Sequence, residues 1–373
     1  MNASAEIFAP GEFLKEEMDA RGWSQIELAE IMGRPTKLVN EIIAGKKAIT
    51  PETAVQLGDA LGTGPGLWMN LESQYQLSKV GTKSNVVARR AVLYERFPVR
   101  DMIRRGWIEA SENIDVLEHQ FLKYFGIKNL TEQACFAAHA AKKAEPMVKL
   151  SMAQLAWLMR AQSVAKSQIC KRYSSEKLSE ALAELGNLRT APEETRHVSK
   201  ILYACGVRFV LVEALPGSKI DGACFWLDDD QPVVALSLRL DRIDNFWFVL
   251  RHELQHVLLG HGRNDDGYIL DVDVEGMDHN KIAKEERLAN DAAAEFCVPQ
   301  GELQDFINRV TPYFSEERVA LFARRLKIHI GLVAGQLRRK LDRYDRWSAH
   351  LVKVRYIVIK SAPVDGWGLV EHS

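Results

Sequence analysis

The feature that most constrains this chain is the pentapeptide His252-Glu253-Leu254-Gln255-His256, which lies inside a strongly apolar run beginning at Phe246. Residues four positions apart stand one above the other on an α-helix, so a helix brings both imidazoles to one side. Two such imidazoles can bind a single zinc ion (Zn2+), and the glutamate between them then lies beside the open coordination position. The sequence therefore predicts a metal-binding helix from Asn245 to Leu259.

A third protein ligand is needed, because a hydrolytic zinc site commonly keeps three protein ligands and leaves the fourth position to water. Glu286 is the best candidate, since it opens a second helical run that continues to Pro299. Asn290 follows one turn later and is placed to hold a ligand histidine by its second ring nitrogen. Zinc in such a site lowers the pKa of its bound water towards about 7, and Glu253 is the candidate base that moves the proton.

Other residues compete for the third ligand position. Gly260 and His261 are adjacent, which is the wrong offset for the longer pattern His-Glu-x-x-His-x-x-Gly-x-x-His. Glu285 is expected to face a different side of its helix from Glu286. Three further candidates lie in the polar connection between the two helices: Glu275, Asp278 and His279. A buried helix with two incidental histidines is the alternative to any metal site.

Short β-rich runs over 207–212, 223–227 and 233–238 precede this helix and are separated by turn residues. They predict a small antiparallel sheet, to which the alternating residues from Val352 to Ile359 would add an edge strand. Helical patterns dominate elsewhere. The predicted class is α+β, with an all-α N-terminal helix-turn-helix domain, a helical connector, and a zincin-like C-terminal domain that combines the sheet with the His-Glu-x-x-His helix.

The chain has 373 residues, which exceeds what one hydrophobic core usually supports. We expect four parts, 1–80, 81–195, 196–310 and a helical extension over 311–373. No apolar stretch approaches the roughly 20 residues that span a bilayer, and no secretory leader is present, so we expect a cytoplasmic protein with no membrane partner. The five cysteines are scattered without a Cys-x-x-Cys pair, which argues against a disulfide framework and a thiolate zinc site.

The first 80 residues predict a run of short amphipathic helices. Ser24 and Glu27 form the pattern of a capping box, Gly33 ends that helix, and the next helix runs from about Pro35 to Gly45. Two short helices joined by a glycine-containing turn form the geometry in which the second helix enters the DNA major groove. A small helical bundle with a solvated polar face is the alternative.

Seven polar residues on or beside these two helices are the candidates for DNA contact: Gln25, Arg34, Thr36, Lys37, Asn40, Lys46 and Lys47. Asparagine pairs with adenine through two hydrogen bonds, whereas lysines mainly add salt-sensitive affinity for phosphates. Residues 1–80 hold seven Lys and Arg against eleven Asp and Glu, while residues 81–110 hold seven against three. DNA contact in the first segment must therefore come from a local patch.

Five N-terminal segments resemble HigA-type antidote proteins, which are helix-turn-helix antitoxins of the XRE class: 10–17, 24–29, 39–46, 49–54 and 67–71. The similarity runs in order through roughly 70 residues. It implies binding of double-stranded operator DNA as a homodimer, repression of the protein's own operon and a cognate toxin as partner. Hydrophobic spacing alone implies none of these properties.

Two C-terminal segments, 246–261 and 286–299, resemble the ImmA/IrrE-like zinc metallopeptidases. The resemblance implies zinc as cofactor, with His252, His256 and Glu286 as ligands, and a repressor of the XRE type as substrate. Gln255 stands where the family usually has Gly, and Ala292 where it usually has Phe. Neither departure removes a ligand, although the bulkier glutamine could narrow the substrate groove.

Two functions are consistent with this sequence, and the residues do not decide between them. In the first, a DNA-binding repressor and antitoxin of a toxin-antitoxin operon carries a zinc metalloendopeptidase domain that cleaves regulatory proteins. In the second, the same domain is not catalytic and senses a metal or binds a partner toxin. Operator DNA is a partner in both.

Overall fold

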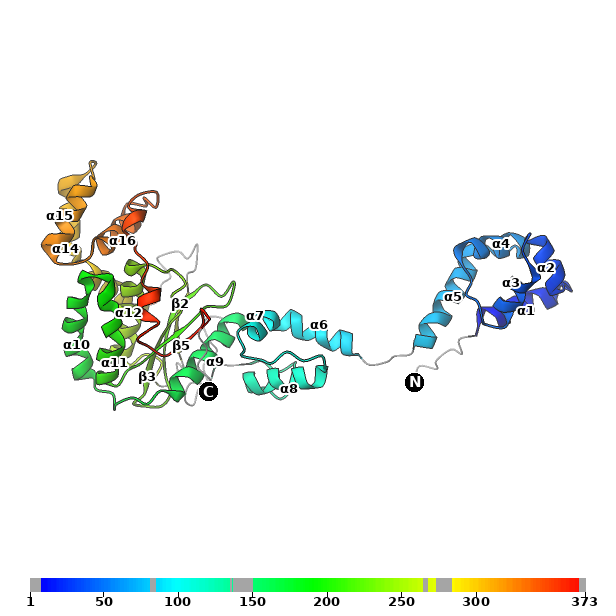
Figure 1. Ribbon diagram of the computed structural model, residues 1–373, viewed down its shortest axis with the longest axis horizontal. Helices are drawn as coiled ribbons and strands as arrows, with labels where there is room; N and C mark the ends of the chain where they lie inside the picture. The colour runs from blue at the N-terminus through cyan, green and yellow to red at the C-terminus, as the bar shows by residue number, and fades with distance from the viewer. Residues whose placement is uncertain are drawn as a thin grey trace. The chain divides into compact units, whose positions relative to one another are not determined.

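The computed structural model describes residues 8–80, 85–134, 136, 150–263, 268–272 and 284–368. They belong to two compact units, Met1–Arg89 and Arg90–Ser373 (Figure 1). The division into four parts expected from the sequence stays a prediction.

The first unit is all-α, as predicted. Its helices are α1 (Pro10–Arg21), α2 (Gln25–Ile31), α3 (Thr36–Ile43), α4 (Pro51–Leu61) and α5 (Pro65–Val80). The capping box is present, because the Ser24 hydroxyl accepts from the backbone of Glu27 and the Glu27 carboxylate accepts from the backbone of Ser24. Gly33 adopts a left-handed φ of 63° and turns the chain from α2 into α3. These features build a helix-turn-helix pair.

The core of the first unit holds this pair in place. Residues from all five helices are fully buried in one cluster, among them Leu14, Leu28, Val39, Leu57 and Trp68. Removing so much apolar surface from water stabilises a domain of this size. The polar faces of α2 and α3 stay at the surface, which leaves them available to a partner.

The second unit is built on a mixed sheet with the order β4-β2-β3-β1-β5 among the described residues. The strands are β1 (Arg208–Val212), β2 (Ile220–Trp226), β3 (Pro232–Leu236), β4 (Tyr268–Val272) and β5 (Val364–Asp365). β2 pairs antiparallel with β3 and β4, whereas β1 pairs parallel with β3 and β5. The prediction of a purely antiparallel sheet is therefore wrong. Among the described strands, β2 and β3 are the one hydrogen-bonded pair that follow each other in the sequence. On its other side β3 runs parallel to β1.

The edge strand predicted over 352–359 is also wrong. A short helix, α17 (Arg355–Val358), forms there, and the edge strand β5 follows it. The cause is Asp241, whose carboxylate accepts from the backbone N–H groups of Val354 and Arg355 at 3.0 and 2.8 Å. This side chain satisfies N–H groups that a strand would have offered to a neighbour.

Helices cover both faces of the sheet. They include α9 (Met152–Ser167), α10 (Ser175–Asn187), α11 (Val198–Cys205), α12 (Ile243–Leu259) and α13 (Lys284–Cys297), with 3-10 turns over Leu188–Thr190, Pro192–His197 and Ser348–His350. Alternate strand residues such as Phe209, Leu211 and Trp226 join the cluster that contains the buried face of α12. α9 contacts β1 and β3, but its buried residues lie outside that cluster. It therefore covers the opposite face.

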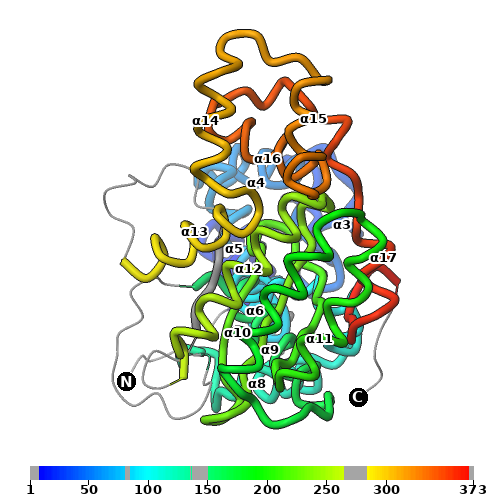
Figure 2. Tube along the Cα trace, turned by 90° about the vertical axis from the view of Figure 1, so that its left-hand side faces the viewer, coloured from blue at the N-terminus to red at the C-terminus, as the bar shows by residue number. Residues whose placement is uncertain are grey.

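α12 is the central helix of this unit and contacts α13, α16 and strands β2 and β3. Three helices gather at one end of the unit (Figure 2): α14 (Gln300–Val310), α15 (Glu316–Leu326) and α16 (Ile330–Lys340). Most of α16 is buried against α12, so the pair α15–α16 packs into the unit. None of the helices described is both long enough and apolar enough to span a membrane.

Two helices before α9, α7 (Val99–Arg104) and α8 (Ile114–Phe125), belong to the same unit, and the boundary between the two units falls within α6 (Val86–Arg96). Phe97 stacks on Phe125 in this helical segment. Asp365 of β5 is fully buried and accepts from Trp107 at 3.0 Å and from Arg160 at 2.6 Å. The Arg105 guanidinium donates to the backbone carbonyl of Asp365 at 3.0 Å. These bonds fasten the helical segment to the edge of the sheet.

Candidate metal centre and DNA-binding helix

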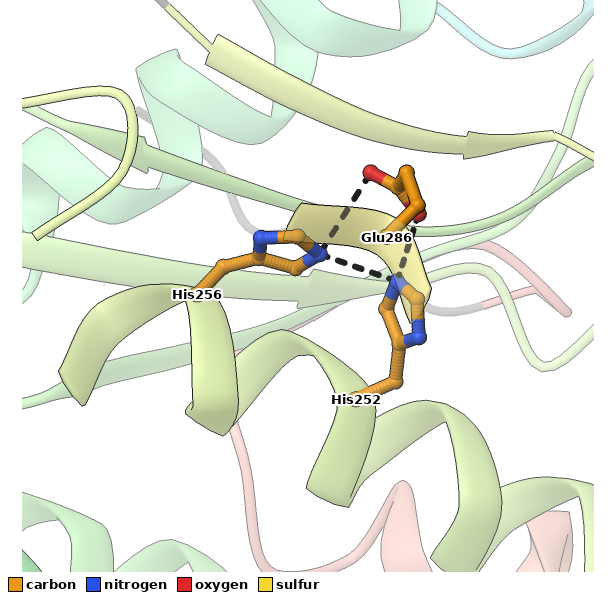
Figure 3. Close-up of side chains that lie close together, drawn as sticks. All are labelled: His252, His256 and Glu286. Atoms are coloured by element: carbon orange, nitrogen blue, oxygen red, sulfur yellow. Dashed lines mark hydrogen bonds and ion pairs between the residues drawn. The ribbon is translucent and has the colours of Figure 1, made fainter. Parts of the chain in front are cut away.

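The metal centre predicted from the sequence is brought together in space. His252 and His256 lie one turn apart on α12 and are almost completely buried, with 1% and 0% of their surfaces exposed. Their Nε2 atoms are 3.1 Å apart and point to the same place (Figure 3). Glu286, in the first turn of α13, places Oε2 at 3.4 Å from Nε2 of His252 and Oε1 at 3.5 Å from Nε2 of His256.

These three side chains fit a zinc ion. Zinc in a tetrahedral site lies about 2.0–2.1 Å from each nitrogen or oxygen ligand, which separates the ligand atoms by about 3.4 Å. The separations of 3.1, 3.4 and 3.5 Å agree with that geometry. Among the residues described, this is the one group of three His, Cys, Asp or Glu whose ligand atoms cluster closely enough for a metal.

The protonation states suit a metal as well. Burial and the neighbouring His252 lower the pKa of His256 to about 3, so its ring is neutral near pH 7. Burial alone would raise the pKa of Glu286, but the hydrogen bond from His252 and the nearby histidines outweigh it and hold the pKa below its usual value. Neutral imidazoles and an ionised carboxylate are the forms that bind zinc.

Glu253 lies between the two histidines in sequence and is completely buried. Its side chain packs against β2 at Gly222, where an added Cβ would lie 2.7 Å from Oε1 of Glu253 and 2.7 Å from Cγ1 of Val249. Glycine leaves this space to the carboxylate, whereas a side chain would have to displace it. Gly222 was not predicted from the sequence, although an isolated glycine at a strand often marks a close approach.

The residue that contacts the second ring nitrogen of His256 differs from the prediction. Asn290 is partly buried on α13, but no hydrogen bond joins it to either imidazole within the described segments. Nδ1 of His256 instead lies 2.8 Å from Nδ1 of His261. Gln255 accepts a hydrogen bond from Arg251 at 2.7 Å, which directs its amide along the helix. The competing positions Glu275, Asp278 and His279 lie outside the described residues.

The DNA-binding candidates gather around α3. Thr36, Lys37 and Asn40 are exposed on this helix, while Val39 and Ile42 face the core. Nδ2 of Asn40 donates to Oε1 of Gln25 at 3.2 Å, which joins the outer face of α3 to the start of α2. The polar face predicted for the second helix of the pair therefore lies at the surface.

The basic candidates behave differently from one another. Lys46 and Lys47 are exposed just after α3, where their backbone N–H groups donate to the carbonyl of Glu41 at 2.8 and 3.1 Å. Lys37 lies 3.8 Å from the Glu41 carboxylate. Arg34 is engaged within the unit, because it donates to Gln56 at 2.9 Å and pairs with Glu52 of α4. It thus supports the fold in addition to any contact with phosphate.

Fold and site together define a helix-turn-helix regulator joined to a His-Glu-x-x-His domain. Residues 14–68 match the helix-turn-helix family model, and residues 207–338 match the peptidase M78 model, described as an IrrE N-terminal-like domain. The chain therefore belongs to the XRE-type helix-turn-helix family through its N-terminal part and carries an IrrE-like domain in its C-terminal part. Both resemblances predicted from the sequence are confirmed.

Similar proteins match the N-terminal part. The HTH-type transcriptional regulator YddM of Escherichia coli is 31% identical over 70 residues, which are 19% of this chain and 74% of that protein. Virulence-associated protein A' of Dichelobacter nodosus is 33% identical over 73 residues, 19% of this chain and 64% of that protein. The chain thus spans less than two thirds of the second relative.

Solved structures match the same part. An antidote protein of a plasmid maintenance system from Nostoc punctiforme is 34% identical, with 20% of this chain and 84% of that chain covered and a TM-score of 0.20. A HigA-family addiction module antidote protein from Coxiella burnetii is 35% identical, with 21% and 86% covered and a TM-score of 0.20. A Pseudomonas aeruginosa protein solved with its operator DNA is 26% identical, with 26% and 99% covered and a TM-score of 0.22.

Proposed function

We propose that this protein is a transcriptional repressor of the antitoxin type whose second unit is a zinc-dependent peptidase acting on a regulatory protein. The observation that carries the enzymatic part is the convergence of His252, His256 and Glu286 within 3.1–3.5 Å of one another. A buried carboxylate, Glu253, follows the first of these ligands directly on α12.

DNA binding is proposed to occur through α3 in the major groove of a double-stranded operator, with the protein as a homodimer. Asn40 is the residue best suited to read a base, since it is exposed on α3 and held by Gln25. Lys46 and Lys47 are exposed beside the helix and supply phosphate contacts. A toxin encoded beside this gene is the expected protein partner.

In the peptidase reaction, His252, His256 and Glu286 would hold the zinc ion. Bound there, zinc would lower the pKa of water and polarise the scissile carbonyl. Glu253 accepts the proton of the attacking water on its carboxylate and delivers it to the leaving amine. Gly222 leaves the space in which that carboxylate stands. A helix-turn-helix repressor of the XRE type is the proposed substrate class.

A second candidate is a regulator that senses a metal or binds a partner toxin without catalysis. The burial of the site favours it, because His252, Glu253 and His256 are each at most 1% exposed. Buried side chains restrict the approach of a peptide, whereas a metal ion needs little room, although 33% of the Glu286 side chain is exposed. The two candidates predict the same metal ligands and the same DNA contacts.

Substitution of Glu253 by glutamine separates the candidates. The zinc-loaded full chain is incubated with a purified XRE-type repressor, and zinc content and operator affinity are measured on the same preparation. We expect cleavage by the wild type, no cleavage by Glu253→Gln, and equal zinc content and operator affinity in both. Glu184→Gln, which changes an exposed carboxylate on α10, is the matched control and should cleave normally.

Three results would contradict parts of this proposal. A cleavage product that persists in Glu253→Gln removes this carboxylate from the reaction. A zinc-loaded wild type that binds its operator but cleaves no repressor contradicts the peptidase and favours the metal-sensing candidate. Purified protein that binds no zinc overturns the metal centre in both candidates.

A further inference from the structure

The end of α12 folds the chain back onto one of the proposed metal ligands. Gly260 adopts a left-handed φ of 71°, its N–H donates to the carbonyl of Val257, and the N–H of His261 donates to the carbonyl of His256 at 3.0 Å. This pair of bonds is a Schellman motif, which reverses the chain over the last helical turn. The residue after the glycine therefore lies against the residue five positions earlier, and here both are histidines.

The side chain of His261 is fixed in this position. Its Nδ1 lies 2.8 Å from Nδ1 of His256, and the two ring centroids are 5.1 Å apart. Its backbone carbonyl accepts from the indole N–H of Trp226 on β2 at 2.9 Å. Only 15% of the His261 side chain is exposed. The residue is thus anchored to the sheet and the helix at once.

The direction of the hydrogen bond follows from the chemistry of the ligand. His256 directs Nε2 at His252 and Glu286, so this nitrogen must keep a lone pair to bind a metal. The proton of the neutral ring then resides on Nδ1 and is donated to Nδ1 of His261, whose own proton resides on Nε2. A second hydrogen-bonding partner of this kind fixes the tautomer and orientation of a metal-bound histidine.

We propose that His261 is a positioning residue for the metal centre, which holds His256 in the tautomer and orientation that bind zinc. It acts through His256 and touches neither metal nor substrate. This inference rests on the proposed metal centre. In it, His261 takes the role predicted for Asn290, which is to hold a ligand histidine by its second ring nitrogen.

Glu285 extends the arrangement on the far side of His261. Its Oε1 lies 3.9 Å from Nε2 of His261, the nitrogen to which the tautomer argument assigns the proton. Two consecutive residues of α13 therefore lie near this pair of histidines. Glu286 lies beside His256 at the proposed metal centre, and Glu285 lies beside His261. Because Glu285 is 56% exposed, its contribution is expected to be small.

The test is zinc affinity of the full chain, measured by competition with a chromophoric chelator, together with the absorption spectrum of the cobalt-substituted protein. His261→Ala is expected to weaken zinc binding about 10- to 100-fold. His261→Asn should recover much of that loss, because its amide oxygen occupies about the place of Nδ1 and accepts the same proton. His119→Ala, which removes an exposed histidine on α8, is the matched control and should bind zinc like the wild type.

Each outcome separates this inference from the metal centre itself. Unchanged zinc affinity in His261→Ala, with a wild type that binds zinc, overturns the role of His261 and leaves the metal centre standing. If His261→Asn binds zinc no more tightly than His261→Ala, then His261 contributes only packing, and its positioning role is also overturned. If the cobalt spectrum of His261→Ala shows the loss of a metal ligand, then His261 is itself a ligand, and the positioning role is overturned. A wild type without zinc overturns both proposals.

Discussion

Gly222 of β2 and Glu253 of α12 are in such close contact that a side chain at position 222 would have to displace its neighbours, because an added Cβ would lie 2.7 Å from the carboxylate oxygen Oε1. The helix and the sheet thus approach each other where the proposed base stands. Gly222→Ala must displace either the Glu253 side chain or the helix that carries it. This contact leads to the first prediction.

Gly222→Ala is expected to reduce cleavage about 100-fold, since a displacement of about 1 Å in a catalytic group has effects of that size. Zinc affinity should change little, because the carboxylate end of the Glu253 side chain moves more easily than the helix that carries His252 and His256. Cleavage and zinc affinity are measured on the same preparation. Gly301→Ala, where an added Cβ meets nothing within 4 Å, is the control. Wild-type cleavage in Gly222→Ala contradicts the role assigned to this contact.

The sequence predicted what depends on local spacing. The interval from His252 to His256 determines a shared helix face in any α-helix, and Ser24 with Glu27 determines where α2 begins, so both were correct. The structure also brings Glu286, in the first turn of the next helix, close to both histidines. Pairings between distant segments could not be predicted in the same way. The parallel alignment of β1 with β3 and the contact of Gly222 with Glu253 depend on how the elements pack.

His261 shows the limit of motif comparison. Its offset ranks it below Glu286 as a third ligand, and comparison with the known pattern assigns it no other role. Gly260 contained the missing signal, since a glycine after the last helical turn predicts a reversal of the chain. The contact of Asn290 with a ligand histidine was predicted from helical spacing alone. That spacing does not show which side chain of α12 a residue of α13 contacts.

The second prediction concerns pH. Burial, with the neighbouring His350, lowers the pKa of His329, whose Nδ1 accepts from the backbone of Gly331 at 3.0 Å at the start of α16. The folded state then binds fewer protons than the unfolded state below about pH 6.5, so stability falls as the pH decreases through that range. The slope from one such group is at most about 1.4 kcal/mol per pH unit.

His329→Asn tests this dependence, because asparagine caps a helix without titrating near neutral pH. Thermal unfolding of the metal-free protein is followed between pH 7.5 and 5. We expect the variant to lose less stability than the wild type as the pH falls. Parallel curves for the two proteins would show that His329 does not contribute to the pH dependence.

The third prediction concerns DNA recognition. Asn40→Ala is expected to cost about 1–3 kcal/mol in operator affinity and to leave affinity for unrelated DNA nearly unchanged, because a base contact is lost. Gln25→Ala should have a smaller effect in the same direction, since Gln25 accepts from the Asn40 amide and holds it in place. Affinities are measured by fluorescence anisotropy with specific and scrambled duplexes. An equal loss on both duplexes contradicts a base-reading role.

The fourth prediction concerns phosphate contacts. Lys46→Ala should weaken binding to specific and scrambled DNA alike and reduce the slope of log affinity against log salt by about 1. Lys79, an exposed lysine whose ammonium lies over the ring of Tyr75 on α5, supplies the control variant Lys79→Ala. An unchanged salt slope in Lys46→Ala removes this lysine from the interface.

The last prediction concerns the edge of the sheet. The carboxylate of Asp365 is fully buried and accepts from Arg160 and Trp107, so its removal takes a buried acceptor away from both side chains. Breaking such a buried pair typically costs about 3–5 kcal/mol. Asp365→Ala should therefore lower the unfolding temperature of the second unit markedly. Asp345→Ala, which removes an exposed ion pair with Arg343, should leave it almost unchanged, because solvent screens such a pair. Equal effects of the two substitutions would mean that the Asp365 bonds do not hold the helical segment to the sheet. In that case limited proteolysis would cut α7 and α9 at the same rate in Asp365→Ala as in the wild type.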